Sequence, residues 1–257
     1  MIDFTTKHRQ PTKSPLSRLG ETRLRKMIGF DPLYFIAVAP AMLLAFWAQG
    51  RVRHNYAVAS QVPAPLSGAA AARHLLDSAG LQAIAIEPIA GQMTDHYDPQ
   101  HKVLRLSEGV YGHRNMAAVG IAAHEAGHAL QDAYRYAPLV VRNLAVPLAN
   151  FGGSTSMLMV MFGAMIPSMR ILIPIGILAF SAVVLFQLVN LPVEFDASSR
   201  AKKQLLEHRI VSQQDMQYVS GVLNSAAWTY VAATLSAVLT LLYLVMRFGG
   251  GGSSDER

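Results

Sequence analysis

The hydrophobic pattern is dominated by four long stretches without a charged residue. They cover residues 33–50, about 149–167, 171–191 and 226–246. An α-helix rises about 1.5 Å per residue, so about 20 apolar residues match the thickness of a bilayer's hydrocarbon core. The pattern predicts an integral, multi-pass membrane protein that is mainly α, with one transmembrane helix in 31–50, two in 138–191 and one in 226–247.

The two ends of the chain differ from these stretches. Residues 1–30 are basic and lack apolar periodicity, which predicts a disordered arm. Residues 248–257 are rich in glycine and serine, which predicts a disordered tail. A cleaved signal peptide ending near Ala48-Gln49-Gly50 is the alternative for the first stretch. The basic arm is long for a signal peptide, which favours a retained helix.

The region 51–137 has the mixed polarity of an α+β portion outside the membrane. A helix is expected over 67–79, ended by Gly80, and strands over 83–89 and 102–107. The turn-forming residues between the two strands favour a small antiparallel β-hairpin. Its edge could pair with an extended peptide, or the hairpin could simply cover the helix that follows.

That following helix, expected over 115–135 with Asn115 as its N-cap, contains a His-Glu-x-x-His motif. His124 and His128 are one turn apart on one face, so both imidazoles can reach one zinc ion. Glu125 lies about 100° round the helix, where it can act as general base toward a zinc-bound water. Two core histidines beside an incidental glutamate are the alternative, but burying these groups without partners would cost several kcal/mol.

A third zinc ligand is expected in a helix and connector over 192–225, with Pro192 in the first turn of that helix. Glu194 and Asp196 point about 200° apart, so only one of them can face the metal. We choose Glu194, with Ser198 one turn further on to orient it. The alternative is that both acids bind no metal and are there because the helix dipole stabilises carboxylates near a helix N-terminus. Two membrane crossings separate Glu194 from the motif, which puts both on the same side of the membrane.

Composition and charge limit the function classes. Hydrophobic residues make up 52% of the chain and charged residues 15%, as in a membrane protein. The absence of cysteine excludes disulfides and thiolate-bound metals. Much of the net charge of +6 lies in residues 1–30, which favours attraction to anionic lipid headgroups over nucleic-acid binding. Basic residues flank both ends of the spans, so the positive-inside rule does not indicate which side the motif faces.

Other polar residues are candidates for supporting roles. Asp132, one turn after His128, could bind a ligand imidazole, and Asp196 could support the metal site from the third-ligand helix. The donor that stabilises the developing oxyanion should come from the loops before the motif. The candidates there are His96, Tyr97, Tyr111 and His113.

Four successive motifs carry a resemblance to a known family. They are TDHYDP at 94–99, LRLSE at 104–108, AAHEAGHALQD at 122–132 and LPVEFDASSRA at 191–201. From about residue 33 to 247 the chain resembles the neutral zinc metallopeptidases typified by bacterial YugP. The resemblance implies a membrane-bound zinc peptidase with a zincin-like portion and a gluzincin-like active site. Related membrane proteases carry an aspartate four residues after the third ligand, where this chain has Ser198.

Together these features predict a zinc metalloendopeptidase with one zinc ion per chain. The expected partners are the lipid bilayer and a polypeptide substrate in or near the membrane, and the expected location is the bacterial cytoplasmic (inner) membrane. A catalytically silent zinc-binding scaffold and a zinc hydrolase of non-peptide amides are the alternatives. A metal transporter would require ionisable groups within the spans, and these four contain almost none.

Overall fold

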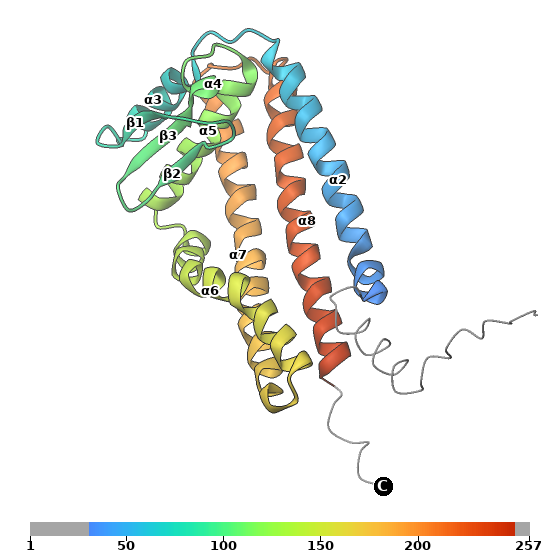
Figure 1. Ribbon diagram of the computed structural model, residues 1–257. Helices are drawn as coiled ribbons and strands as arrows, with labels where there is room; N and C mark the ends of the chain where they lie inside the picture. Colours follow the sequence, from blue (N-terminus) through green and yellow to red (C-terminus); the bar gives the residue numbers. More distant parts are fainter. Residues whose placement is uncertain (1–30, 250–257) are drawn as a thin grey trace, which may run out of the picture.

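Four long helices form the body of the protein, a computed structural model that describes residues 31–249 (Figure 1). They are α2 (Pro32–Ser60), α6 (Ala137–Met165), α7 (Leu172–Glu207) and α8 (Met216–Phe248). Each is long and apolar enough to cross a membrane, which confirms the four expected spans. The predicted basic arm over 1–30 and nearly all of the predicted tail lie outside the described residues.

The four helices pack in a row, in which the first and the last of the chain are neighbours. α2 lies along α8, α8 along α7, and α7 along α6, with the 3₁₀ turn η1 (Pro167–Met169) between α6 and α7. The Asp31 carboxylate caps α2 by accepting a 3.0 Å hydrogen bond from the Leu33 N–H. It also accepts a 2.5 Å bond from the Tyr243 hydroxyl of α8. This contact ties the two helices together at one end of the bundle.

Two helices extend further than the sequence pattern predicted. α2 continues to Ser60, ten residues beyond the apolar stretch. α7 is one helix with Pro192 in its interior, so the prediction of a new helix beginning at Pro192 is wrong. A proline removes one helical hydrogen bond, but the packing on either side of it keeps the helix continuous. Buried residues recur every four positions beyond it, at Val193, Ala197, Ala201 and Leu205.

The small sheet has three strands in the order β1-β3-β2. The strands are β1 (Ala85–Ile89), β2 (His96–Asp98) and β3 (Val103–Ser107). β1 and β3 are parallel, so the prediction that they form an antiparallel hairpin is wrong. The hairpin is formed by β2 and β3, which are antiparallel. The chain between the two predicted strands contains a strand of its own, which takes the antiparallel position at the edge of the sheet.

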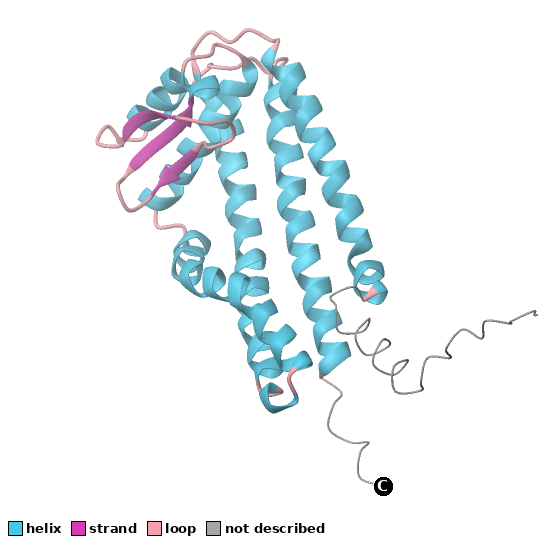
Figure 2. Ribbon diagram, in the orientation of Figure 1, coloured by secondary structure: helices cyan, strands magenta, loops and turns pink. Residues whose placement is uncertain are grey.

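The sheet and the shorter helices cover one end of the bundle (Figure 2). α3 (Gly68–Ser78) and α4 (Glu108–Tyr111) flank α5 (Met116–Ala133), whose N-cap is Asn115 as predicted: its side chain accepts a 2.9 Å hydrogen bond from the Ala118 N–H. A single buried core joins α3, β3 and α5 to the ends of α7 and α8 nearest the sheet. The membrane-spanning helices and the α+β portion are therefore packed as one unit.

The backbones of α5 and α7 approach each other closely at Gly127. A Cβ atom placed there would lie 2.7 Å from the carbonyl oxygen of Ala197 and 3.2 Å from its Cα. Because both neighbours are backbone atoms, only a glycine permits this separation of the two helices.

We expect Gly127→Ala to force α5 and α7 apart and to lower the free energy of unfolding by about 1–3 kcal/mol. Thermal unfolding of the detergent-purified protein would measure the loss. Gly153→Ala in α6 is the matched control, because nothing lies within 4 Å of the added methyl group. Equal melting temperatures for the two variants would contradict the argument.

Candidate metal centre

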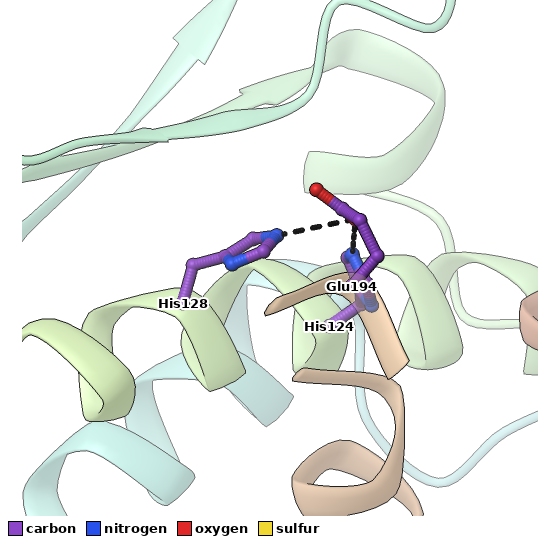
Figure 3. A group of neighbouring side chains, drawn as sticks. All are labelled: His124, His128 and Glu194. Atoms are coloured by element: carbon purple, nitrogen blue, oxygen red, sulfur yellow. Dashed lines mark hydrogen bonds and ion pairs between the residues drawn. The ribbon is translucent and has the colours of Figure 1, made fainter. Parts of the chain in front are cut away.

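Three side chains from two helices converge on one point (Figure 3). α5 supplies His124 and His128, and α7 supplies Glu194; one potential ligand atom from each lies within 4.8 Å of the other two. The Nε2 atoms of His124 and His128 are 3.3 Å and 3.6 Å from Oε2 of Glu194. Ligands at zinc's usual bond lengths of about 2.0–2.2 Å in a tetrahedral site are about 3.3 Å apart. The three side chains can therefore hold one metal ion, and the donor set suits zinc.

A polar side chain at Nδ1 fixes the orientation of each histidine ring. His124 Nδ1 lies 3.1 Å from the Ser198 hydroxyl, and His128 Nδ1 lies 2.9 Å from Oε1 of Gln131. With Nδ1 engaged in each ring, Nε2 is the nitrogen left facing Glu194. Ser198 was expected to orient Glu194, but in the structure it contacts His124 instead.

Gln131 is a member of the site that sequence analysis did not identify. It is completely buried, and its Nε2 donates to the Val193 carbonyl at 2.7 Å and to Oδ2 of Asp196 at 2.8 Å. Asp196 also binds Nε of Arg200 at 2.5 Å. Asp196 thus lies behind the metal ligands rather than among them. The spacing of three residues from His128, which brings side chains together on a helix, was the signal that could have revealed Gln131.

Asp132 does not contact either imidazole. Its carboxylate accepts a 2.7 Å hydrogen bond from the Tyr97 hydroxyl and a 2.5 Å bond from Nζ of Lys102. Burial and the neighbouring Asp132 carboxylate raise the pKa of Tyr97, so its hydroxyl stays protonated and donates. Asp132 therefore joins α5 to the hairpin.

Glu125 lies beside the edge strand β2. The Tyr97 N–H donates a 3.2 Å hydrogen bond to its Oε2. Among the other loop candidates, His96 Nδ1 contacts the Thr94 carbonyl at 2.7 Å. Tyr111 packs against the buried core, and His113 is exposed. The structure brings Glu125 and Tyr97 together but does not gather all four loop candidates at the site.

The electrostatics of the centre favour a cation. Burial disfavours the charged form of His128, yet Glu194, Glu125 and Gln131 outweigh that effect and raise its pKa above the usual value in the metal-free protein. A metal ion that binds His128 must therefore displace a proton that the imidazole holds favourably. Metal affinity should fall as the pH is lowered, because protons then compete for the same nitrogen.

Comparisons with known proteins agree with this chemistry. Residues 34–249 match the family described as "Putative neutral zinc metallopeptidase". The chain belongs to this family. It is 43% identical over 221 residues to the protein named "Putative membrane protease YugP" from Bacillus subtilis, a match that covers 85% of this chain and 98% of that protein. No solved structure matches the chain.

Family membership and the structure together give the broad character of the molecule. The chain is a member of a zinc peptidase family, it has four apolar helices suited to a membrane, and it has a His₂Glu group that can bind one metal ion. A zinc cofactor, a peptide substrate and membrane lipid are the partners that these findings support.

We expect Gln131→Met, which keeps the side-chain volume but removes the hydrogen bond to His128, to weaken zinc binding about 10- to 100-fold. Competition with a fluorescent chelator would measure the affinity. Gln82→Met is the control, because Gln82 is exposed and bonds only to the Asp77 carbonyl. Unchanged zinc affinity in Gln131→Met would show that Gln131 does not support the metal site.

Proposed function

We propose that this protein is a membrane-anchored zinc endopeptidase whose metal ligands are His124, His128 and Glu194. The observation that carries the proposal is the convergence of three ligand atoms from α5 and α7 at separations suited to one tetrahedral ion. Glu125, the neighbour of His124 in the motif, accepts a hydrogen bond from the backbone N–H of Tyr97 in the edge strand.

The proposed reaction is hydrolysis of a peptide bond. Zinc bound at this site would polarise the scissile carbonyl and lower the pKa of a water molecule toward neutrality. Glu125 accepts a proton from the attacking water and returns it to the leaving amine. The Tyr97 N–H holds the Glu125 carboxylate in place during the first of these transfers.

The edge strand gives a place for an extended polypeptide. β2 pairs with β3 on one side only. Because the Tyr97 N–H reaches Glu125 in α5 rather than β3, this N–H points away from the sheet and toward the catalytic residue. A substrate strand pairing along the outer side of β2 would pass directly over Glu125.

The depth of the site favours membrane proteins or membrane-proximal polypeptides as substrates. Trp47 of α2 and Trp228 of α8 stack edge to face at 5.8 Å, and both are about half exposed. Paired tryptophans of this kind are typical of the membrane–water interface. Glu194 follows the apolar stretch of α7 by three residues, about 4.5 Å of helix, so the site lies close to that interface.

In this proposal the catalytic unit combines the polar portion over 51–137 with the third-ligand segment over 192–225. The four spans hold this unit at the surface of a bacterial cytoplasmic membrane. The relative from Bacillus subtilis, named as a membrane protease, supports the bacterial membrane location.

We expect purified wild-type protein to contain about one zinc ion per chain. Glu194→Ala should lose the zinc, and Glu125→Gln should keep it but lose cleavage of casein or a membrane-protein substrate. Glu207→Gln is the matched control, since Glu207 is a carboxylate of the same helix about 20 Å further on, where it pairs with Lys203. Metal content by mass spectrometry and gel-based cleavage assays would measure these outcomes.

Three results would separate the alternatives. Zinc retained in Glu194→Ala would reject the ligand set. Full zinc content with no cleavage of any polypeptide would favour a catalytically silent scaffold. Release of fatty acid from lipid amides, in place of peptide cleavage, would favour a hydrolase of non-peptide amides.

A further inference from the structure

The face of α8 that is turned toward the metal centre carries a tyrosine, Tyr230. Val219 on this helix packs against Gly120 of α5, and the Thr234 hydroxyl lies 3.4 Å from the Gln187 carbonyl of α7. At about 100° per residue, Tyr230 is rotated only about 20° from Val219 and about 40° from Thr234. Tyr230 therefore lies on the face that meets α5 and α7.

The register of α7 and α8 puts Tyr230 at the height of the metal ligands. The two helices are antiparallel, with Gln187 beside Thr234 and Lys202 bonded to Asn224 at 3.0 Å. Residues before Thr234 in α8 therefore lie beside residues after Gln187 in α7. Tyr230 falls between Asn190 and Glu194 of α7.

The position of Tyr230 brings its side chain toward two carboxylates. Glu194 and Glu125 are both close enough to the phenol to act on it electrostatically. A hydroxyl near both a metal ligand and the general base borders the space in which the scissile carbonyl must lie. Tyr97, the tyrosine suggested by the sequence, instead donates its hydroxyl to Asp132.

Two further polar atoms near Tyr230 lack hydrogen-bond partners in the described part of the chain. The Arg142 guanidinium of α6 acts electrostatically on Tyr230, and its Nε is buried without a hydrogen bond. Oδ1 of Asn190, one turn before Glu194, is also buried without a donor. Buried groups of this kind are costly unless something pairs with them. A bound peptide, with its own N–H and C=O groups, is suited to do so.

We propose that the hydroxyl of Tyr230 donates the hydrogen bond that stabilises the oxyanion formed during peptide hydrolysis. The inference rests on the proposed peptidase function and names the group on this chain that would complete its active site. Tyr230 enters from a membrane-spanning helix rather than from the loops before the motif.

The step is balanced without any further reactant. As the water oxygen bonds to the carbonyl carbon, the C=O π-electron pair moves onto the carbonyl oxygen, and Glu125 takes the water proton. The Tyr230 O–H donates a hydrogen bond to this oxygen and keeps its own proton. When the C=O bond re-forms, the C–N bond breaks and the amine leaves with the proton from Glu125. The positive charge of Arg142 nearby favours negative charge at the same place.

The test compares Tyr230→Phe with wild type and with Tyr243→Phe in the detergent-purified full chain loaded with zinc. Tyr243 is a matched control on the same helix, about 20 Å away, with its hydroxyl bonded to Asp31. Tyr230→Phe should lower kcat about 100- to 1,000-fold with little change in KM, because the bond strengthens only as charge develops. Zinc content should stay at the wild-type value.

Binding of a phosphinic peptide, whose tetrahedral phosphinate mimics the oxyanion, provides a readout that needs no turnover. Its affinity for zinc-loaded Tyr230→Phe should fall by a factor similar to the fall in kcat, while Tyr243→Phe binds as wild type does. Unchanged kcat and phosphinate affinity in Tyr230→Phe would overturn the proposal and leave the peptidase function intact. Loss of zinc from Tyr230→Phe would also overturn it, because Tyr230 would then position Glu194. Wild type that neither cleaves peptides nor binds the phosphinate would reject the peptidase function itself.

Discussion

The close contact between α5 and α7 is the constraint on which the rest of the structure depends. Two buried polar side chains, His128 and Glu194, and the partly buried His124 must meet there, and burying such groups without partners would cost much solvation free energy. The helices approach closely because small residues line α5, above all Gly127 against the backbone of Ala197. Two neighbouring elements pack against this pair of helices: α8 lies along both of them, and the hairpin lies beside Glu125.

The structure explains why the elements around α5 are arranged as they are. The buried partners of the two histidines, Gln131 and Ser198, are each fixed by the same two helices that supply the ligands. Asp132 links the C-terminal part of α5 to β2 through Tyr97 and to the turn before β3 through Lys102. The metal centre is thus held by a network of hydrogen bonds that extends to the edge of the sheet, and this network fixes the height of β2 above Glu125.

Much of this arrangement could be predicted from local patterns and topology. The Asn115 cap and small-residue pattern predicted α5, and apolar stretches predicted the four spans. An even number of crossings put Glu194 on the same side as the motif, a conclusion that needed no distances. The strand pairing could not be predicted, because a parallel partner and a three-residue edge strand leave little periodicity. Pro192 was misleading because the stabilisation of α7 comes from packing against α5 and α8, which lies outside any local sequence rule.

The continuity of α7 has a mechanical consequence. One uninterrupted helix, Leu172–Glu207, carries both a membrane span and Glu194. Gln131 of α5 bonds to the Val193 carbonyl and to Asp196 of α7, and Gly127 leaves no space between the two helices. A tilt of α7 in response to the thickness of the surrounding lipid would therefore carry α5 with it. The His₂Glu group moves as one body, and its internal distances do not depend on the bilayer.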